Sequence, residues 1–180
     1  MNNFAEIIEV QRFQKVTYYT LSINDEDTLF DKFIEKHSIE NNEKLQHIIT
    51  WMKLIGNKIG AHQQYFRHEA ETADASALPP QGVDKEPIYV EYNEETETEE
   101  NKPNNLRLYC LRANKSVVFL FNGDIKTADT AQNCEQVKPH FRLANKLTEL
   151  LNSAFTNKEI TWNDSVTDII VEDGFLLEWD

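Results

Sequence analysis

The first part of the chain combines β-like and helical patterns of hydrophobic positions. Residues 4–10 and 16–23 are rich in β-branched and aromatic side chains, which predicts two strands. Asp25 or Asp27 then precedes a helical pattern and is expected to accept the free N–H groups of its first turn. Apolar side chains recur there at helical spacing, which predicts a helix of about three turns, and they are Leu29, Phe30, Phe33 and Ile34.

A second helical pattern follows Asn41 and Asn42, either of which suits the N-cap position. Gly60 is the expected C-terminal stop, because glycine tolerates the left-handed backbone that ends many helices. The two helices therefore predict a helical hairpin packed on a sheet. The apolar stripe of the second helix consists of Leu45, Ile48, Ile49, Met52, Ile55 and Ile59, with Trp51 at its margin.

The next segment is polar and acidic. Residues 61–83 predict a loop, since their two consecutive prolines favour extended backbone and remove a hydrogen-bond donor. Alternation over residues 87–92 predicts one strand. Glu94–Glu100 is a run of like charges, which we expect to be solvated and disordered. Residues 70–104 are thus expected to form an acidic, mobile insertion.

Two apolar runs on either side of Asn114-Lys115 predict a β-hairpin with a two-residue turn. Because side chains alternate along a strand, one face of this hairpin is more apolar than the other and should be core. The expected core side chains are Leu108, Cys110, Phe119 and Phe121. Arg107 and Tyr109 then face solvent or a ligand. The cross-strand pairs that this turn implies are Arg112 with Val117, Tyr109 with Leu120, and Arg107 with Asn122.

The C-terminal part predicts a helix and a last hairpin. Pro139 suits a first helical turn, and the helix stripe consists of Leu143, Leu147, Leu150, Leu151 and Ala154. Asp173-Gly174 lies between two apolar runs and predicts a tight turn between strands, within a C-terminal hairpin extension over residues 160–180. The fold class is therefore α+β, a helical hairpin on a small antiparallel sheet with an additional helix, in a single domain over residues 1–180.

Charge complicates any link to nucleic acid. The net charge is −13, with 18 Lys and Arg against 31 Asp and Glu. Residues 101–150 hold eight bases and four acids, a net of +4, and the rest hold ten bases and 27 acids, a net of −17. Such a chain repels nucleic acid at long range unless the positive block forms its own patch.

Other features favour a soluble cytoplasmic protein without a metal. No apolar run approaches the ~20 residues of a membrane-spanning helix, and the acidic N-terminus does not resemble a signal peptide. Cys110 and Cys134 are the only cysteines and have no metal-ligand spacing. We expect Cys110 to be a buried, inert thiol and expect no disulfide. Trp162 and Trp179 are expected to be core or interface anchors.

The element order and three short motifs resemble the RelE/HigB-like toxins, in particular their phage-derived Gp49-like branch. The motifs are Tyr-Phe-Arg-His-Glu at residues 65–69, Leu-Arg-Leu-Tyr at 106–109 and Asn-Gly-Asp-Ile-Lys-Thr at 122–127. The resemblance covers residues 28–150. It implies a RelE-like α+β fold and an endoribonuclease that cleaves mRNA through attack by the ribose 2′-OH. It also implies RNA or the ribosome as a target and a helix-turn-helix antitoxin as partner.

That reaction needs a base for the 2′-OH, cations for the phosphate and an acid for the leaving oxygen. Carried over from the resemblance, the catalytic candidates are Arg67, His68, Arg107, Tyr109 and Lys126. Arg107 or Lys126 would hold the phosphate, whereas Tyr109 would stack on a base or shuttle a proton. His68 is a further acid or base. The resemblance implies neither a cofactor nor a metal.

A second hypothesis is a catalytically inactive RelE-like scaffold that acts as a protein-interaction module. Family toxins are compact and basic, whereas this chain is acidic and carries the insertion at residues 70–104. On this reading Arg107 and Tyr109 belong to an ordinary exposed strand face. Arg67 and His68 then fix their loop by pairing with Glu69 or Glu71. Lys126 is then an ordinary loop lysine.

Overall fold

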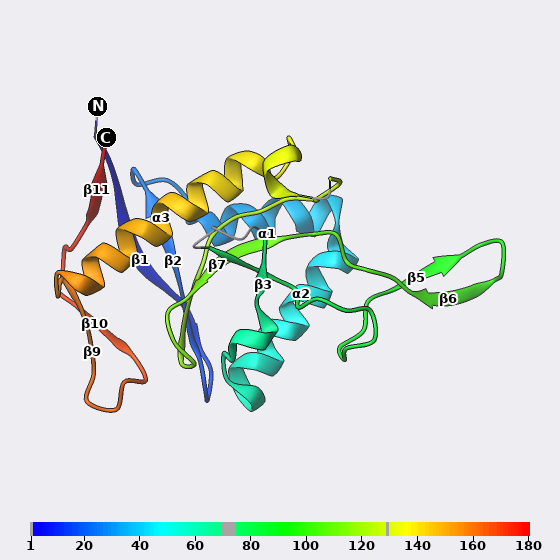
Figure 1. Ribbon diagram of the computed structural model, residues 1–180, viewed down its shortest axis with the longest axis horizontal. Coiled ribbons are helices and arrows are strands. Elements are labelled where there is room, and N and C mark those ends of the chain that lie inside the picture. The colour runs from blue at the N-terminus through cyan, green and yellow to red at the C-terminus, as the bar shows by residue number, and fades with distance from the viewer. Residues whose placement is uncertain (1, 70–74, 129) are drawn as a thin grey trace.

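The computed structural model describes residues 2–69, 75–128 and 130–180, which form an α+β fold (Figure 1). The main sheet has seven strands in the order β11-β1-β2-β8-β7-β4-β3, and all its pairs are antiparallel except β2 with β8. Its strands are β1 (Asn3–Arg12), β2 (Thr17–Ile23), β3 (Arg67–His68), β4 (Ser76–Leu78), β7 (Leu108–Arg112), β8 (Val117–Leu120) and β11 (Leu177–Trp179). The two-stranded sheets are β5 (Val90–Asn93) with β6 (Thr98–Asn101), and β9 (Ile160–Trp162) with β10 (Ile169–Val171).

Helices cover both faces of the main sheet. On one face, α1 (Leu29–Glu40) and α2 (Asn42–Leu54) pack against the strands through Phe33, Ile48 and their neighbours. On the other face, α3 (Lys138–Thr156) packs against the same strands in a second core. The sheet is therefore the middle of three layers, and its central strands are buried on both sides. Short helical turns are η1 (Ile55–Ile59), η2 (Gln63–Tyr65) and η3 (Ala131–Asn133).

The expected helices are confirmed, but their caps differ. Thr28, rather than Asp25 or Asp27, caps α1, and its hydroxyl accepts the N–H of Asp31 at 3.1 Å. Asn41 precedes α2 without a side-chain cap. The π-helical turn η1 extends α2 to Gly60, whose φ of +89° is the left-handed stop that the sequence predicts.

The acidic middle segment contains more regular structure than its composition suggests. The expected loop over residues 61–83 includes β3 and β4, which extend the edge of the main sheet. The expected disordered run Glu94–Glu100 instead forms a turn and most of β6, paired with β5. This hairpin projects from the body of the molecule on the side opposite the two chain termini (Figure 1). Residues 70–74 of the expected insertion lie outside the described residues.

The β7–β8 hairpin forms as expected, but its register is displaced by one residue. Cys110 faces Leu120 and Arg112 faces Val118, so the expected pairs are wrong. Asn114 explains the shift, because its Oδ1 accepts the N–H groups of Ser116 (2.8 Å) and Val117 (2.9 Å). This side-chain turn makes the loop three residues long instead of two. As a result, Leu108 and Cys110 share their core with Val118 and Leu120, and the expected Phe119 and Phe121 lie on the opposite face.

The C-terminal elements also pair differently. Pro139 lies in the first turn of α3 as expected. Asp173-Gly174 does not close a hairpin, because β10 pairs with β9 and β11 pairs with β1. The turn instead carries the chain from one sheet to another, which brings the two termini together (Figure 1). Trp162 and Trp179 pack partly buried against the core, and Trp162 stacks on Phe155 with ring centroids 5.1 Å apart.

Candidate functional site

Two of the candidate cationic residues, Arg107 and Lys126, converge on Glu69, which the sequence suggested only as a loop partner of Arg67 or His68. Arg107 Nε donates to Glu69 Oε1 at 3.0 Å, and Lys126 Nζ donates to the other oxygen, Glu69 Oε2. The chain after β8 runs beside the start of β7, where Lys126 N–H donates to Asn105 O at 2.8 Å. This pairing places Lys126 beside Arg107. The exposed side-chain fractions are 0% for Glu69, 9% for Arg107 and 12% for Lys126, so the three form a buried ion network.

Arg67 adds a third positive charge beside this network. Its guanidinium donates to the carbonyl oxygens of Pro79 (3.0 Å) and Pro80 (3.2 Å). Burial and the charge of Arg107 lower the pKa of Arg67 to about 10, so it remains protonated at neutral pH. Burial likewise lowers the pKa of Arg107. Among the described residues, Glu69 is thus paired with two cations, and Arg67 adds a third positive charge nearby without contacting the carboxylate.

Tyr109 lies in the same region but is shielded from solvent. Its exposed fraction is 0%, and its ring packs on Phe141 of α3 with centroids 5.5 Å apart. Burial raises the pKa of the Tyr109 phenol. Its hydroxyl makes no hydrogen bond with any residue that the structure describes. Tyr109 is therefore a core side chain with an unsatisfied polar end.

His68 does not join the network. It is exposed, and no hydrogen bond or ion pair within the described ranges links it to Glu69, Arg107 or Lys126. Strand alternation explains this, since His68 sits between Arg67 and Glu69 and points away from the side that they share. The suggested pairing of Arg67 or His68 with Glu69 is not formed. Glu71 lies outside the described residues.

The expected exposure of Arg107 and Tyr109 is wrong. Tyr109 is on the strand face that α3 covers, and Arg107 is buried in its pairing with Glu69, and a hairpin pattern alone reveals neither contact. Two of the three guanidinium nitrogens of Arg107 already donate, Nε to Glu69 and Nη1 to the carbonyl oxygens of Asn104 (2.7 Å) and Leu106 (3.3 Å). The sequence suggested Glu69 only as a partner of its neighbours Arg67 and His68, because the contact from Glu69 to Arg107 spans 38 positions.

The β5–β6 hairpin is a second candidate site, and it is exposed. On the face that looks toward α2, Tyr92 is 62% exposed, Ile88 37% and Val90 36%. A cavity of about 410 Å³ lies between these side chains and α2, with Glu43 and Glu99 among its lining residues. The groove therefore combines exposed apolar and aromatic groups with negative charge.

The hairpin is anchored to α2 through His47. Its Nε2 is 2.9 Å from the Pro87 carbonyl oxygen before β5, and its Nδ1 is 3.0 Å from the Asn104 amide after β6. The partners assign a neutral ring in which Nε2–H donates and Nδ1 accepts. Burial lowers the pKa of His47, consistent with that state. One histidine thus holds both ends of the acidic hairpin.

Among residues 2–69, 75–128 and 130–180, no group of three or more His, Cys, Asp or Glu is arranged to hold a metal ion. No helix within these same residues is long and apolar enough to cross a membrane. Cys110 and Cys134 are free and buried, as expected for Cys110, and burial raises the pKa of the Cys110 thiol.

No model of a protein family, no curated protein and no solved structure matches this chain. The resemblance to RelE/HigB-like toxins therefore rests on the element order and the three motifs alone.

Proposed function

We propose that this chain is a protein-interaction module on a RelE/HigB-like scaffold, which binds a basic partner protein in the cytoplasm. The groove between α2 and the β5–β6 hairpin is the proposed docking surface. One observation carries this proposal, namely the exposed Tyr92 on a projecting hairpin of glutamates. The free cysteines agree with a reducing compartment.

The apolar side of the groove supplies anchors for a partner. Tyr92, Val90 and Ile88 leave large apolar groups exposed within one short segment. Exposed aromatic side chains of this kind are enriched among the residues that dominate binding energy in interfaces. Their position beside a hollow of about 410 Å³ gives an inserted partner side chain a place to pack.

The charge of the hairpin defines the partner as basic. Residues 91–100 contain six glutamates and no base. Glu91 and Glu100 even face each other across the strands, a like-charge pair that disfavours the hairpin in isolation. Tyr89 and Asn93 offset it by donating to Glu91 (2.8 Å) and Glu100 (3.0 Å). A partner rich in Lys and Arg would be steered towards this surface and would relieve the repulsion.

The test compares partner capture by wild type and by Tyr92→Ala in extracts of the native host. Tyr92 is exposed, so its truncation should leave the fold intact while weakening a specific complex by about tenfold or more. Ile170→Ala is the matched control, since Ile170 is 55% exposed on β10, away from the groove. The captured protein should be basic, should bind the purified chain stoichiometrically, and should dissociate as salt is raised. A complex that survives Tyr92→Ala unchanged contradicts the proposed surface.

A second candidate function is an mRNA-cleaving toxin that is silenced by a helix-turn-helix antitoxin. It is favoured by the convergence of Arg67, Arg107 and Lys126 from three separate segments, with Lys126 still 12% exposed at the rim. RNA binding there requires Glu69 to release at least one cation. The phosphate would then take the place of the carboxylate between Arg107 and Lys126.

Induced expression in a host cell distinguishes the two functions. A toxin arrests growth, and Lys126→Gln relieves the arrest although the variant protein remains soluble. Lys102→Gln is the control, since Lys102 is an exposed lysine at the base of the hairpin. Growth that continues with abundant soluble wild-type protein excludes the toxin and leaves the interaction module.

A further inference from the structure

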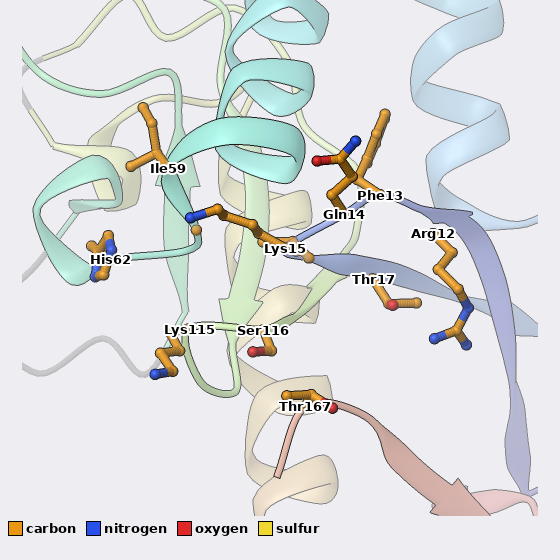
Figure 2. Close-up of a pocket in the computed structure, with 12 residues that line it drawn as sticks. Arg12, Phe13, Gln14, Lys15, Thr17, Ile59, His62, Lys115, Ser116 and Thr167 are labelled. Atoms are coloured by element: carbon orange, nitrogen blue, oxygen red, sulfur yellow. The ribbon is translucent and has the colours of Figure 1, made fainter. Parts of the chain in front are cut away.

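We propose that a cavity at one end of the main sheet binds a small molecule that carries a phosphate. The cavity has a volume of about 540 Å³ and lies among the β1–β2 turn, the end of η1 and the β7–β8 turn (Figure 2). It shares no lining residue with the groove beside the acidic hairpin or with the Glu69 network. The inference is therefore independent of the proposed function.

The charge of the cavity is opposite to that of the chain. Arg12, Lys15, Lys115 and His62 line it, and none of its lining residues is Asp or Glu. This is notable because acids outnumber bases by 31 to 18 in the sequence. Arg12 contributes little, since it is paired with Glu9 and Asp168. Lys15 and Lys115 have no ion-pair partner within residues 2–69, 75–128 and 130–180, and they carry the proposed site.

The parallel pairing of β2 and β8 brings these two lysines to the same level. Thr17 is in register with Val117. Lys15 lies two residues before Thr17, and Lys115 lies two residues before Val117. Both side chains extend towards the side of the cavity where His62 lies in the view of Figure 2. Lys15 and Lys115 therefore bring two positive charges to the same end of this strand pair. A bound dianion would be attracted to both.

Hydroxyl groups at the floor of the cavity add neutral donors. Thr17 and Ser116 are 4% and 7% exposed, and their backbones are joined by a bond from Thr17 N–H to Ser116 O at 2.9 Å. Both residues line the cavity. Neither hydroxyl forms a hydrogen bond among the described residues, and neither is among the fully buried polar atoms that lack a partner, so both are accessible from the cavity. Ser116 adjoins Lys115, whereas Thr17 lies on the Arg12 side of the cavity in Figure 2. A serine hydroxyl beside lysines suits phosphate oxygens.

The size of the cavity favours a small molecule over a bare ion. Pockets for small ligands have volumes of about 300–1,000 Å³, and this cavity lies within that range. Gly60 lies at the edge of the cavity and has a positive φ. The expected ligand therefore has a phosphate at the lysines and a further body in the remaining space.

The experiment measures pyrophosphate binding to the full chain by calorimetry at constant ionic strength. We expect saturable binding at one site, weakened by about tenfold or more in Lys15→Gln/Lys115→Gln. The control is Lys53→Gln/Lys85→Gln, which removes two exposed lysines that do not line the cavity and should leave binding unchanged. Ser116→Ala should weaken binding several-fold, because it removes one donor next to Lys115.

Three results would overturn the proposal. The first is the absence of saturable binding up to about 1 mM pyrophosphate. The second is equal affinity in wild type and Lys15→Gln/Lys115→Gln, with circular dichroism showing that both are folded. The third is an oligouridylate that competes with pyrophosphate and binds more tightly, which would assign the lysines to an RNA strand instead of a small molecule.

Discussion

Arg107 and Glu69 form a salt bridge in which Nε and Oε1 are 3.0 Å apart, although the residues are separated by 38 positions in the sequence. Both side chains are almost fully shielded from water. At such a site the desolvation of each ion is large, and their attraction only offsets it while both partners are present. The intact pair therefore adds little net stability, but the loss of either partner should strongly destabilise the fold.

Replacement of Glu69 should be strongly destabilising. Glu69→Gln leaves Arg107 and Lys126 without a counter-charge at a buried site, so we expect the free energy of unfolding to fall by about 3–5 kcal/mol. Glu26→Gln is the matched control, because Glu26 pairs with Lys32 at a site where the two side chains are 61% and 37% exposed. That change should lower stability by less than about 1 kcal/mol. Urea denaturation measures both, and equal effects would contradict the structural role of the network.

Removal of the Tyr109 hydroxyl should be harmless to stability. The group has no hydrogen-bond partner among the described residues, so Tyr109→Phe should leave the free energy of unfolding unchanged or raise it by up to about 1 kcal/mol. Tyr18→Phe is the control, since the Tyr18 hydroxyl donates to the Met52 carbonyl at 2.8 Å in the core. That variant should lose about 1–2 kcal/mol. Loss of RNA cleavage in a stable Tyr109→Phe variant would instead support the toxin function.

Gly123 should not tolerate a side chain. A Cβ atom there would lie 1.7 Å from the carbonyl oxygen of Arg107, and that backbone cannot move without disturbing the pairing beside β7. We expect Gly123→Ala to lower stability by about 3 kcal/mol or more. Gly174→Ala meets no atom within 4 Å, but its φ is +81°, so it should lower stability by about 1 kcal/mol through backbone strain alone. Thermal unfolding of the two variants separates these causes, and an unaffected Gly123→Ala would disprove the close approach.

Stability should decrease on mild acidification. Burial lowers the pKa of His47 and of His37, and each ring is held neutral between a carbonyl oxygen and an asparagine amide. Because the pKa in the folded state is below the unfolded value of about 6.5, their contribution is complete above that pH. It is lost as the pH falls through the folded-state pKa. The free energy of unfolding should therefore decline below about pH 6.5, by at most about 1.4 kcal/mol per pH unit for each group.

His47→Gln tests the contribution of the hairpin anchor to this decline. The variant should be less stable at neutral pH but should show a shallower pH dependence than wild type. Amide hydrogen exchange in residues 90–101 should also rise on acidification of the wild type, because His47 ties both ends of that hairpin to α2. His68→Gln is the control, as His68 is exposed. An identical slope in wild type and His47→Gln would contradict the assignment.

Local patterns predict the elements well where one physical cause dominates. The spacing of Leu45 and Ile48 marks the buried face of α2, Gly60 ends its helical extension, and Pro139 marks the first turn of α3. In each case the sequence signal and the structural constraint lie within a few residues of each other. A period of apolar positions or a special φ angle needs no knowledge of the rest of the chain.

The candidate site was only partly predictable, because its contacts join segments that are distant in the sequence. Arg107 and Lys126 carry charges that the sequence displays, but Glu69 supplies their counter-ion through a tertiary contact, and Arg67 instead donates to the carbonyl oxygens of Pro79 and Pro80. Tyr109 alternates with core residues along β7, and this pattern is the same whether its own face is exposed or covered. The packing of α3 decides that Tyr109 is buried. The side-chain turn at Asn114 displaces the register by one residue and so reverses the faces of β8.

The sequence by itself determined the α+β class, the helical hairpin, most of the strands and the acidity of residues 91–100, because these follow from local periodicity and composition. Only the tertiary structure decided that Glu69 neutralises the expected cations, that Asp173-Gly174 joins two sheets, and that Lys15 and Lys115 meet at one end of a parallel strand pair. Those outcomes depend on which distant segments share a surface, and burial and charge pairing between such segments have no local signature.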